Sequence, residues 1–168
     1  GHSVLTAVSA IRKEGLEAHA LQQYAVAERH YRTLLDAEAC LDVVINLGAL
    51  LLSQGRLREG SLFYQKWVKH FGAEERLLLN ACNCWNDSNE AELVLQTLTP
   101  LLQNKKITTR LKLCLSDALH RLSRFQDCIS LLNQCLEGNS SNDKEIWIRL
   151  GLSHSKNNSL VAALESFN

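Results

Sequence analysis

Residues 41–74 read LDVVINLGALLLSQGRLREGSLFYQKWVKHFGAE, and apolar or small residues recur in this segment at helical spacing. The members of the first run are Val44, Leu47, Gly48 and Leu51, and those of the second are Leu57, Gly60, Tyr64, Trp67 and Val68. Residues spaced i, i+3, i+4 and i+7 lie on one face of an α-helix. Because Ser53-Gln54-Gly55 separates the two runs, the segment predicts two amphipathic helices joined by a turn.

Residues of matching size return along the chain every 33 to 35 positions. In the first helix of each pair, the small residue is Gly15, Gly48, Cys82, Ser116 or Gly151. In the second helix, Ala27, Tyr31 and Leu34 precede Gly60, Tyr64 and Trp67 by a constant 33 residues. One helical pair cannot bury its apolar face alone, whereas stacked pairs share a core. The spacing therefore predicts a single domain, residues 1–168, with repeats at about 8–40, 41–74, 75–108, 109–143 and a truncated 144–168.

This pattern resembles the tetratricopeptide repeat (TPR), a helix-turn-helix unit with the signature W-x2-L-G-x2-Y, A-x3-F, P. The matches are Val44-x2-Leu47-Gly48-x2-Leu51, Gly60-x3-Tyr64 and Gly72, then Trp147-x2-Leu150-Gly151-x2-His154 and Ala163-x3-Phe167. The resemblance covers residues 8–168 and implies an all-α fold, an α-α superhelix in the form of a right-handed solenoid. It also fits the TPR region of a larger bacterial protein.

The composition supports a helical core and argues against several classes of protein. One proline, eight glycines and 46% hydrophobic residues favour helices with enough apolar surface to bury. Lys plus Arg and Asp plus Glu number 18 each, so there is no basic field to attract nucleic acid. No apolar run long enough to span a membrane and no signal-peptide core is present, so we expect a cytoplasmic protein without a membrane partner. The Gly1-His2 start and the absence of methionine suggest an excised domain.

Three expectations concern packing. Pro100 removes a backbone hydrogen bond and presses on the carbonyl of Gln96, which predicts a kink or an early end of the sixth helix. Gly151 and Ala163 are expected to let the two helices of the fifth pair approach closely. His154 stands at an aromatic position of the repeat and is expected in the core or at its rim.

The six cysteines give little sign of metal binding or catalysis. Cys82, Cys128 and Cys135 occupy small-residue positions of the repeat and are expected to be buried thiols. Cys82 and Cys84 lie about 200° apart around a helix, and no C-x2-C or H-x3-H pair occurs, so we expect no metal. The absence of a glycine-rich phosphate loop or a nucleophile elbow predicts no enzyme and no cofactor. A cysteine-histidine pair that meets only in space stays open.

Polar stripes on the first helices are the candidate binding surface, since the TPR resemblance implies that these helices line the concave face. Each stripe follows the spacing i, i+4, i+7 and i+11. The stripes are Ser9, Lys13, Leu16, Ala20; Asp42, Asn46, Ala49, Ser53; Arg76, Asn80, Asn83, Asp87; Arg110, Cys114, Asp117, Arg121; and Glu145, Arg149, Leu152, Lys156. The candidate peptide-binding residues are Arg12, Lys13, Asn46, Arg76, Asn80, Asn83, Arg110, Asp117 and Arg149.

Two further resemblances suggest how these residues would bind. Asn46 and Asn80 are similar to the asparagine ladder with which the repeats of O-linked N-acetylglucosamine transferases hold a peptide backbone. Arg12, Asn46 and Arg76 resemble three members of the carboxylate clamp of chaperone-binding repeats, whereas Leu16 and Asn80 depart from the other two. The basic groups favour an acidic or C-terminal ligand.

The sequence thus predicts a scaffold that binds an extended peptide or protein segment. Two alternatives stay open. One is a substrate-recognition appendage of a larger enzyme, of the glycosyltransferase or sulfotransferase type. The other is self-association, with a homodimer formed through the truncated last repeat.

Overall fold

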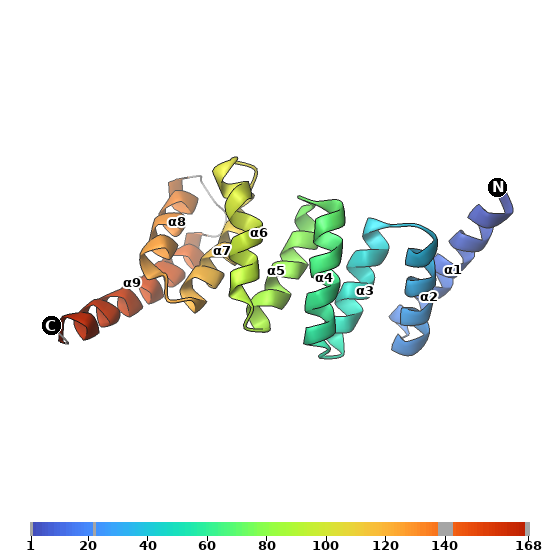
Figure 1. The fold of residues 1–168 in the computed structure, drawn as a ribbon, viewed down its shortest axis with the longest axis horizontal. Helices are drawn as coiled ribbons and strands as arrows, with labels where there is room; N and C mark the ends of the chain where they lie inside the picture. The colour runs from blue at the N-terminus through green and yellow to red at the C-terminus, as the bar shows by residue number, and fades with distance from the viewer. Residues whose placement is uncertain (1, 22, 138–142, 167–168) are drawn as a thin grey trace. The chain divides into compact units, whose positions relative to one another are not determined.

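The computed structural model describes residues 2–21, 23–137 and 143–166. Within these ranges the regular structure is helical, with no strand, as the sequence predicts (Figure 1). The helices are α1 (His2–Ala20), α2 (Tyr24–Ala37), α3 (Leu41–Ser53), α4 (Leu57–Phe71), α5 (Glu75–Asp87), α6 (Ala91–Gln103), α7 (Thr109–Arg121), α8 (Phe125–Glu137) and α9 (Asp143–Ser166). None of them is both long enough and apolar enough to cross a membrane.

The chain divides into two compact units, Gly1–Cys84 and Trp85–Asn168, and the division falls within α5. In the first unit, α1 packs on α2, α2 on α3 and α3 on α4. In the second unit, α6 packs on α7, α7 on α8 and α8 on α9. Within each unit these helices therefore contact their neighbours in sequence, which is the arrangement expected of a repeat protein.

Three turns between the helices of a pair share one backbone geometry. The turn residues Gly55, Asn89 and Ser123 have φ angles of 72°, 60° and 60° and are 34 residues apart. After each of them, an amide reaches back to the carbonyl five residues earlier: Arg56 to Leu51 at 3.0 Å, Glu90 to Trp85 at 2.7 Å and Arg124 to Leu119 at 2.8 Å. A left-handed residue followed by this bond is a Schellman motif, which ends one helix and reverses the chain.

A missing side chain on the first helix makes room for an aromatic ring from the second. A Cβ built at Gly48 would lie 2.7 Å from Tyr64 Cζ, and one built at Gly15 would lie 3.2 Å from Tyr31 Cε1. Both tyrosines are fully buried. The close approach predicted at the small positions is therefore present in the first two helical pairs, and it accounts for the shared 33-residue offset.

Pro100 does not end α6 early, because the helix continues to Gln103. The proline lies in the last turn, so only the carbonyl of Gln96 loses its helical donor. Both Gln96 and Pro100 are exposed residues. The expectation of an early end was wrong because a proline this close to a helix terminus removes one bond that water can replace.

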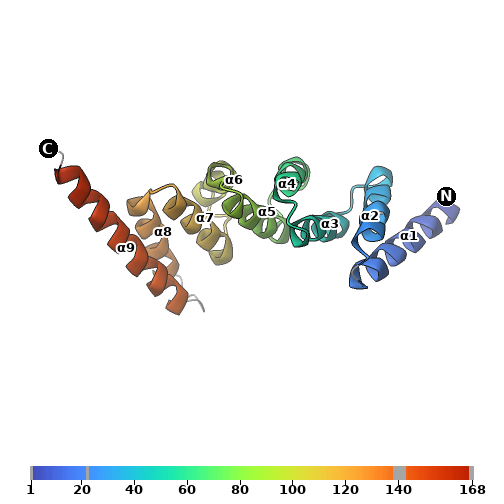
Figure 2. The ribbon, with the colours of Figure 1, turned by 90° about the horizontal axis from the view of Figure 1, so that it is seen from below.

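The fifth repeat also departs from the prediction. In place of two short helices, the structure has α9 as one unbroken helix of 24 residues (Figure 2). Asn158 stands 35 residues after Ser123, at the turn position, yet it is helical. The hydroxyl of Ser159 donates to the Ser155 carbonyl at 3.0 Å, a bond within the continuous helix.

Without that turn, the expected packing within the fifth repeat is missing. Gly151, His154 and Ala163 are all exposed, and a Cβ added at Gly151 meets no atom within 4 Å. The predicted contact between Gly151 and Ala163 and the predicted core position of His154 are therefore wrong. The side chains of α9 that are buried are Ile146, Leu150 and Ser153, on another face of the helix.

Arg56 joins the turn of the second repeat to α2. Its guanidinium donates to Glu28 at 2.5 and 3.3 Å and to Glu59 at 2.6 and 3.0 Å. Glu28 also accepts from Arg32 at 2.9 Å. The hydrogen bond from Arg56 is the main cause that lowers the pKa of Glu28, against a partial burial that would raise it.

The contact between Gly48 and Tyr64 predicts a coupled pair of substitutions. Gly48→Ala should lower the free energy of unfolding by about 1–3 kcal/mol, because the added methyl overlaps the ring. Tyr64→Phe removes a buried hydroxyl that has no hydrogen-bond partner among the described residues, and it should raise stability by about 1 kcal/mol. In the double variant, the free energy of unfolding should fall by less than the sum of the two single changes predicts. Urea denaturation of the four proteins measures this, and strict additivity would contradict the contact.

The ion pairs of Glu28 predict a defined pH dependence. Because the folded-state pKa lies below the ordinary value of 4.5, the charged form stabilises the fold above about pH 5. This contribution is lost as the pH falls through the folded-state pKa. Glu28→Gln should cost about 1 kcal/mol at neutral pH, and the difference from wild type should vanish in acid. Urea denaturation across this pH range tests it, with the exposed Glu17→Gln on α1 as the control, and a difference that persists in acid would exclude an electrostatic cause.

Candidate functional site

The five predicted stripes remain accessible in the structure. All of their members are exposed or half-buried, and none enters the core. In α3, for example, Val44, Leu47 and Leu51 are buried, while Asp42 and Asn46 lie on the accessible side. The face that packs and the face that could bind a partner are therefore separate on each first helix, as the two spacings predict.

The candidate residues of the first unit include one ion pair. Arg12 of α1 donates to Asp42 of α3 at 2.7 Å, so its charge is matched by a neighbouring stripe residue. Lys13 and Arg76 are exposed, and Asn46 is half-buried. The two other candidates in this unit are the half-buried Asn80 and the exposed Asn83.

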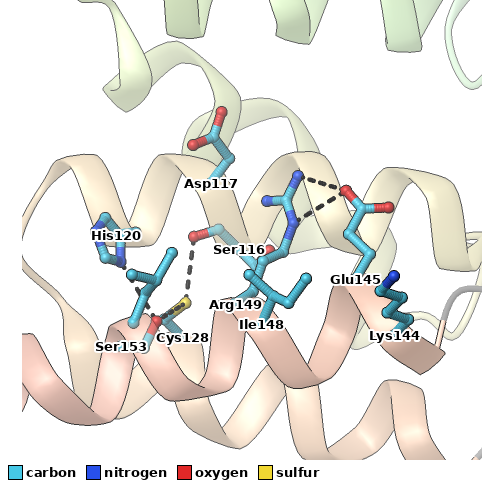
Figure 3. A pocket seen from close by; sticks show the side chains of 10 residues that line it. Ser116, Asp117, His120, Cys128, Lys144, Glu145, Ile148, Arg149 and Ser153 are labelled. Carbon is cyan, nitrogen blue, oxygen red and sulfur yellow. Dashed lines mark hydrogen bonds and ion pairs between the residues drawn. The ribbon is translucent and has the colours of Figure 1, made fainter.

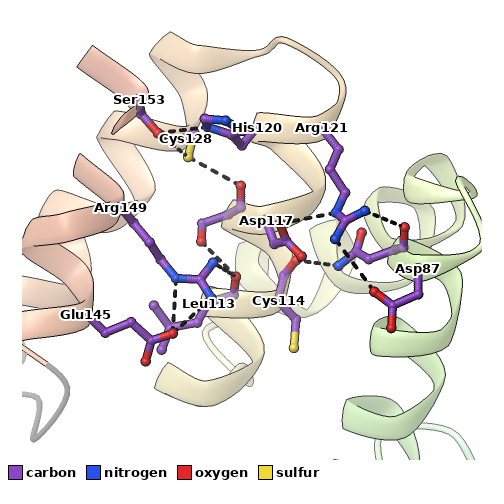
Figure 4. Close-up of polar contacts among 12 residues, drawn as sticks. Asp87, Leu113, Cys114, Asp117, His120, Arg121, Cys128, Glu145, Arg149 and Ser153 are labelled. Carbon is purple, nitrogen blue, oxygen red and sulfur yellow. Dashed lines mark hydrogen bonds and ion pairs between the residues drawn. The ribbon is translucent and has the colours of Figure 1, made fainter. Parts of the chain in front are cut away.

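In the second unit, arginines bind the backbone of the neighbouring helix (Figure 4). Arg149 of α9 donates to Glu145 at 2.9 and 3.2 Å and to the Leu113 carbonyl of α7 at 3.3 Å. Arg121 of α7 donates to Asp117 at 3.2 Å and to the Asn86 carbonyl at 2.8 Å. These contacts hold Arg149 and Asp117 in fixed positions, whereas the candidate Arg110 is exposed. Sequence spacing placed these residues on helix faces but gave no sign of their backbone partners.

An open hollow of about 650 Å³ lies between α7 and α9 (Figure 3). Four of its lining residues are members of the predicted stripes, namely Asp117, Glu145, Arg149 and Leu152. Exposed Lys144 and Ile148 extend the lining along α9. The hollow therefore combines charges of both signs with apolar side chains, a composition suited to the side chains of a peptide.

Buried polar groups line the same hollow and form a hydrogen-bonded chain (Figures 3 and 4). The thiol of Cys128 donates to the Ser116 carbonyl at 3.3 Å, and its sulfur lies 3.3 Å from Ser153 Oγ. Ser153 Oγ in turn lies 3.3 Å from His120 Nδ1. The residues come from α7, α8 and α9, so this network tethers three helices to one another.

The network brings a cysteine and a histidine together, but the thiol is not activated. Burial raises the pKa of Cys128, and the hydrogen bond with Ser153 opposes that rise only in part. A reactive cysteine needs the opposite shift, toward the thiolate. Ser153 Oγ bridges the two groups, because it lies 3.3 Å from the thiol sulfur and 3.3 Å from His120 Nδ1.

The prediction of buried thiols at the small positions is confirmed for Cys82, Cys128 and Cys135. Sequence reasoning missed Ser153 and His120 as partners of Cys128. The one available signal was a polar residue, Ser116, at a position where other repeats have glycine. Among the described residues, no group of three or more His, Cys, Asp or Glu side chains could hold a metal ion.

The raised pKa predicts slow labelling of Cys128 by iodoacetamide. At pH about 8 the buried thiol should stay protonated and react far more slowly than half-buried Cys40. Mass spectrometry of the labelled peptides over time gives both rates in one sample, and unfolding in urea should make them equal. Labelling of native Cys128 as fast as Cys40 would show an activated, accessible thiol and would reopen the case for nucleophilic chemistry.

No protein-family model and no curated protein matches the sequence. Solved structures do match. MamA of AMB-1 aligns with a TM-score of 0.69 and 19% identity over 94% of this chain and 93% of that chain. MamA of MSR-1 gives 0.69 and 17% over 96% and 92%. A tetratricopeptide repeat protein from Parabacteroides merdae gives 0.72 and 17% over 90% of this chain and 59% of that chain. With its repeated helical pairs and 34-residue turn spacing, the chain has the tetratricopeptide-repeat fold.

Proposed function

We propose that this protein is a protein-interaction module that binds a segment of a partner on the accessible faces of its first helices. Repeat proteins of this kind commonly use such faces for binding, since the opposite faces are consumed by packing. The observation that carries the proposal is that predicted stripe residues and a hollow coincide in the second unit. Four residues of the predicted stripes line a hollow that also offers apolar surface.

The chemistry of the hollow favours a particular kind of segment. Glu145 forms an ion pair with Arg149, and Asp117 forms one with Arg121. These pairs shape the walls of the hollow and leave the hollow with little net charge. Exposed Lys144 supplies a cation beside the apolar surface of Ile148 and Leu152. A segment with an apolar side chain next to an acidic side chain, or next to its own C-terminal carboxylate, would complement both.

The candidate residues of the first unit would contribute separately. Asn46 and Asn80 each offer a donor and an acceptor and could hold a peptide backbone whatever its side chains. Lys13 and Arg76 are exposed cations on the same helices as Arg12 and Asn80 respectively. We assign no catalytic role to any of these residues, because none of them pairs a nucleophile with a base.

Selection from a library of random peptides displayed on phage tests the proposal. Peptides that bind the wild-type protein should carry an acidic group or a free C-terminus close to an apolar residue. Leu152→Ser and Lys144→Glu should each weaken binding by about tenfold, because each removes one side of the complementarity. Isothermal titration calorimetry measures the dissociation constants.

The exposed Asn133→Ala on α8 is the matched control, since it changes a polar surface residue away from the hollow. It should leave the affinity unchanged. Peptides that bind wild type and both hollow variants equally well would place recognition elsewhere on the protein and would refute the proposed site.

A further inference from the structure

The two halves of α9 expose the positions that are buried in every earlier repeat. The earlier equivalents of Gly151 are Gly15, Gly48, Cys82 and Ser116, and those of Ala163 are Ala27, Gly60, Val94 and Cys128. All eight of these residues are buried, whereas Gly151 and Ala163 are exposed. The fifth repeat therefore contains both packing faces without the contact between them.

Large apolar side chains mark the same two faces. Trp147 is 62% exposed in the first half of α9, and Leu160 and Leu164 are 40% and 58% exposed in the second half. At 100° per residue, the face of Trp147 and Gly151 lies roughly 220° around the helix from the face of Leu160 and Leu164, or about 140° by the shorter way. In the straight helix the two faces thus point to nearly opposite sides, and only a reversal of the chain between them can bring them together.

The residue at the reversal point is suited to a turn. Asn158 follows Gly55, Asn89 and Ser123 in the series of turn residues, each of which is left-handed. Asparagine is among the residues that adopt this conformation most readily after glycine, and Asn89 does so in this chain. The Ser159 hydroxyl bonded to the Ser155 carbonyl competes with the backbone at the same point.

We propose that α9 is the open form of a fifth helical hairpin, which closes at Asn158 so that residues 159–166 cover the face of Trp147 and Gly151. Closure adds a second helix to the last repeat. Of the residues that line the hollow, Arg149 and Leu152 lie on the side of α9 away from Trp147 and stay accessible after closure. The hairpin is a conformational switch at the end of the second unit and goes beyond the proposed peptide site.

Trp147 reports the state of α9 directly, because it is exposed in the open helix and would be covered in the hairpin. Asn158→Gly favours the left-handed turn, and Asn158→Ala favours the straight helix. The ratio of closed to open form should differ by at least about fivefold between the two variants. Relative to Asn158→Ala, Asn158→Gly should show Trp147 emission at shorter wavelength and weaker quenching by acrylamide, with wild type between them. A Trp147→Phe version of each variant emits only from Trp67 and Trp85. Subtracting its spectrum leaves the emission of Trp147.

Two further variants make the result decisive. Lys156→Gly introduces the same helix-weakening residue two positions away and should leave Trp147 exposed. Leu160→Asp with Leu164→Asp in the Asn158→Gly background should return Trp147 to solvent, because burying a carboxylate against the indole is costly. Identical emission and quenching for Asn158→Gly and Asn158→Ala would overturn the proposal. So would a blue shift that grows with protein concentration, because covering of Trp147 by a second copy depends on concentration and closure does not.

Discussion

The structure depends on where each first helix stops. Left-handed backbone angles occur at the same position of successive repeats, at Gly55, Asn89 and Ser123. The amide after each of these residues donates a hydrogen bond to a carbonyl in the last turn of the preceding helix. A stop one residue earlier or later would rotate the second helix by about 100° relative to the first and would present the wrong side chains to it. The 34-residue spacing of these turns is thus the constraint that keeps the small residues of the first helices facing the second helices.

The position of each turn also determines which surface of the first helix is left for binding. Once Gly48 receives Tyr64, the opposite side of α3 cannot be buried by its own partner helix, and Asp42 and Asn46 remain accessible. The same reasoning applies to α7 and α9, where the accessible sides meet at the hollow. Cys128, Ser153 and His120 fix the spacing of the helices behind it, so the walls of the hollow are held by bonds that a ligand does not need to replace.

The sequence predicted the first four helical pairs, their register and the accessible stripes, because side-chain size and helical period determine these features locally. It failed at Pro100, since the cost of a proline depends on its distance from the helix end, and that end is set by the turn that follows. The ion pairs of Arg12 and Arg149 could not be foreseen, because long side chains choose among several nearby carboxylates and carbonyls. The Cys128 network joins three helices and leaves no spacing pattern in the chain.

The contrast between Ser123 and Asn158 shows that the turn residue alone does not make a hairpin. Asn89 and Ser123 each carry a conformational cost of about 1 kcal/mol or more for a left-handed backbone. The helices that follow offset it, since Val94 and Leu98 of α6 and Leu132 of α8 are fully buried, and each such side chain contributes about 1.5–3 kcal/mol. After Asn157, every described residue of α9 is exposed, so no burial offsets the same cost in the open helix. A helical pair in this chain therefore forms only where both of its helices bury apolar surface.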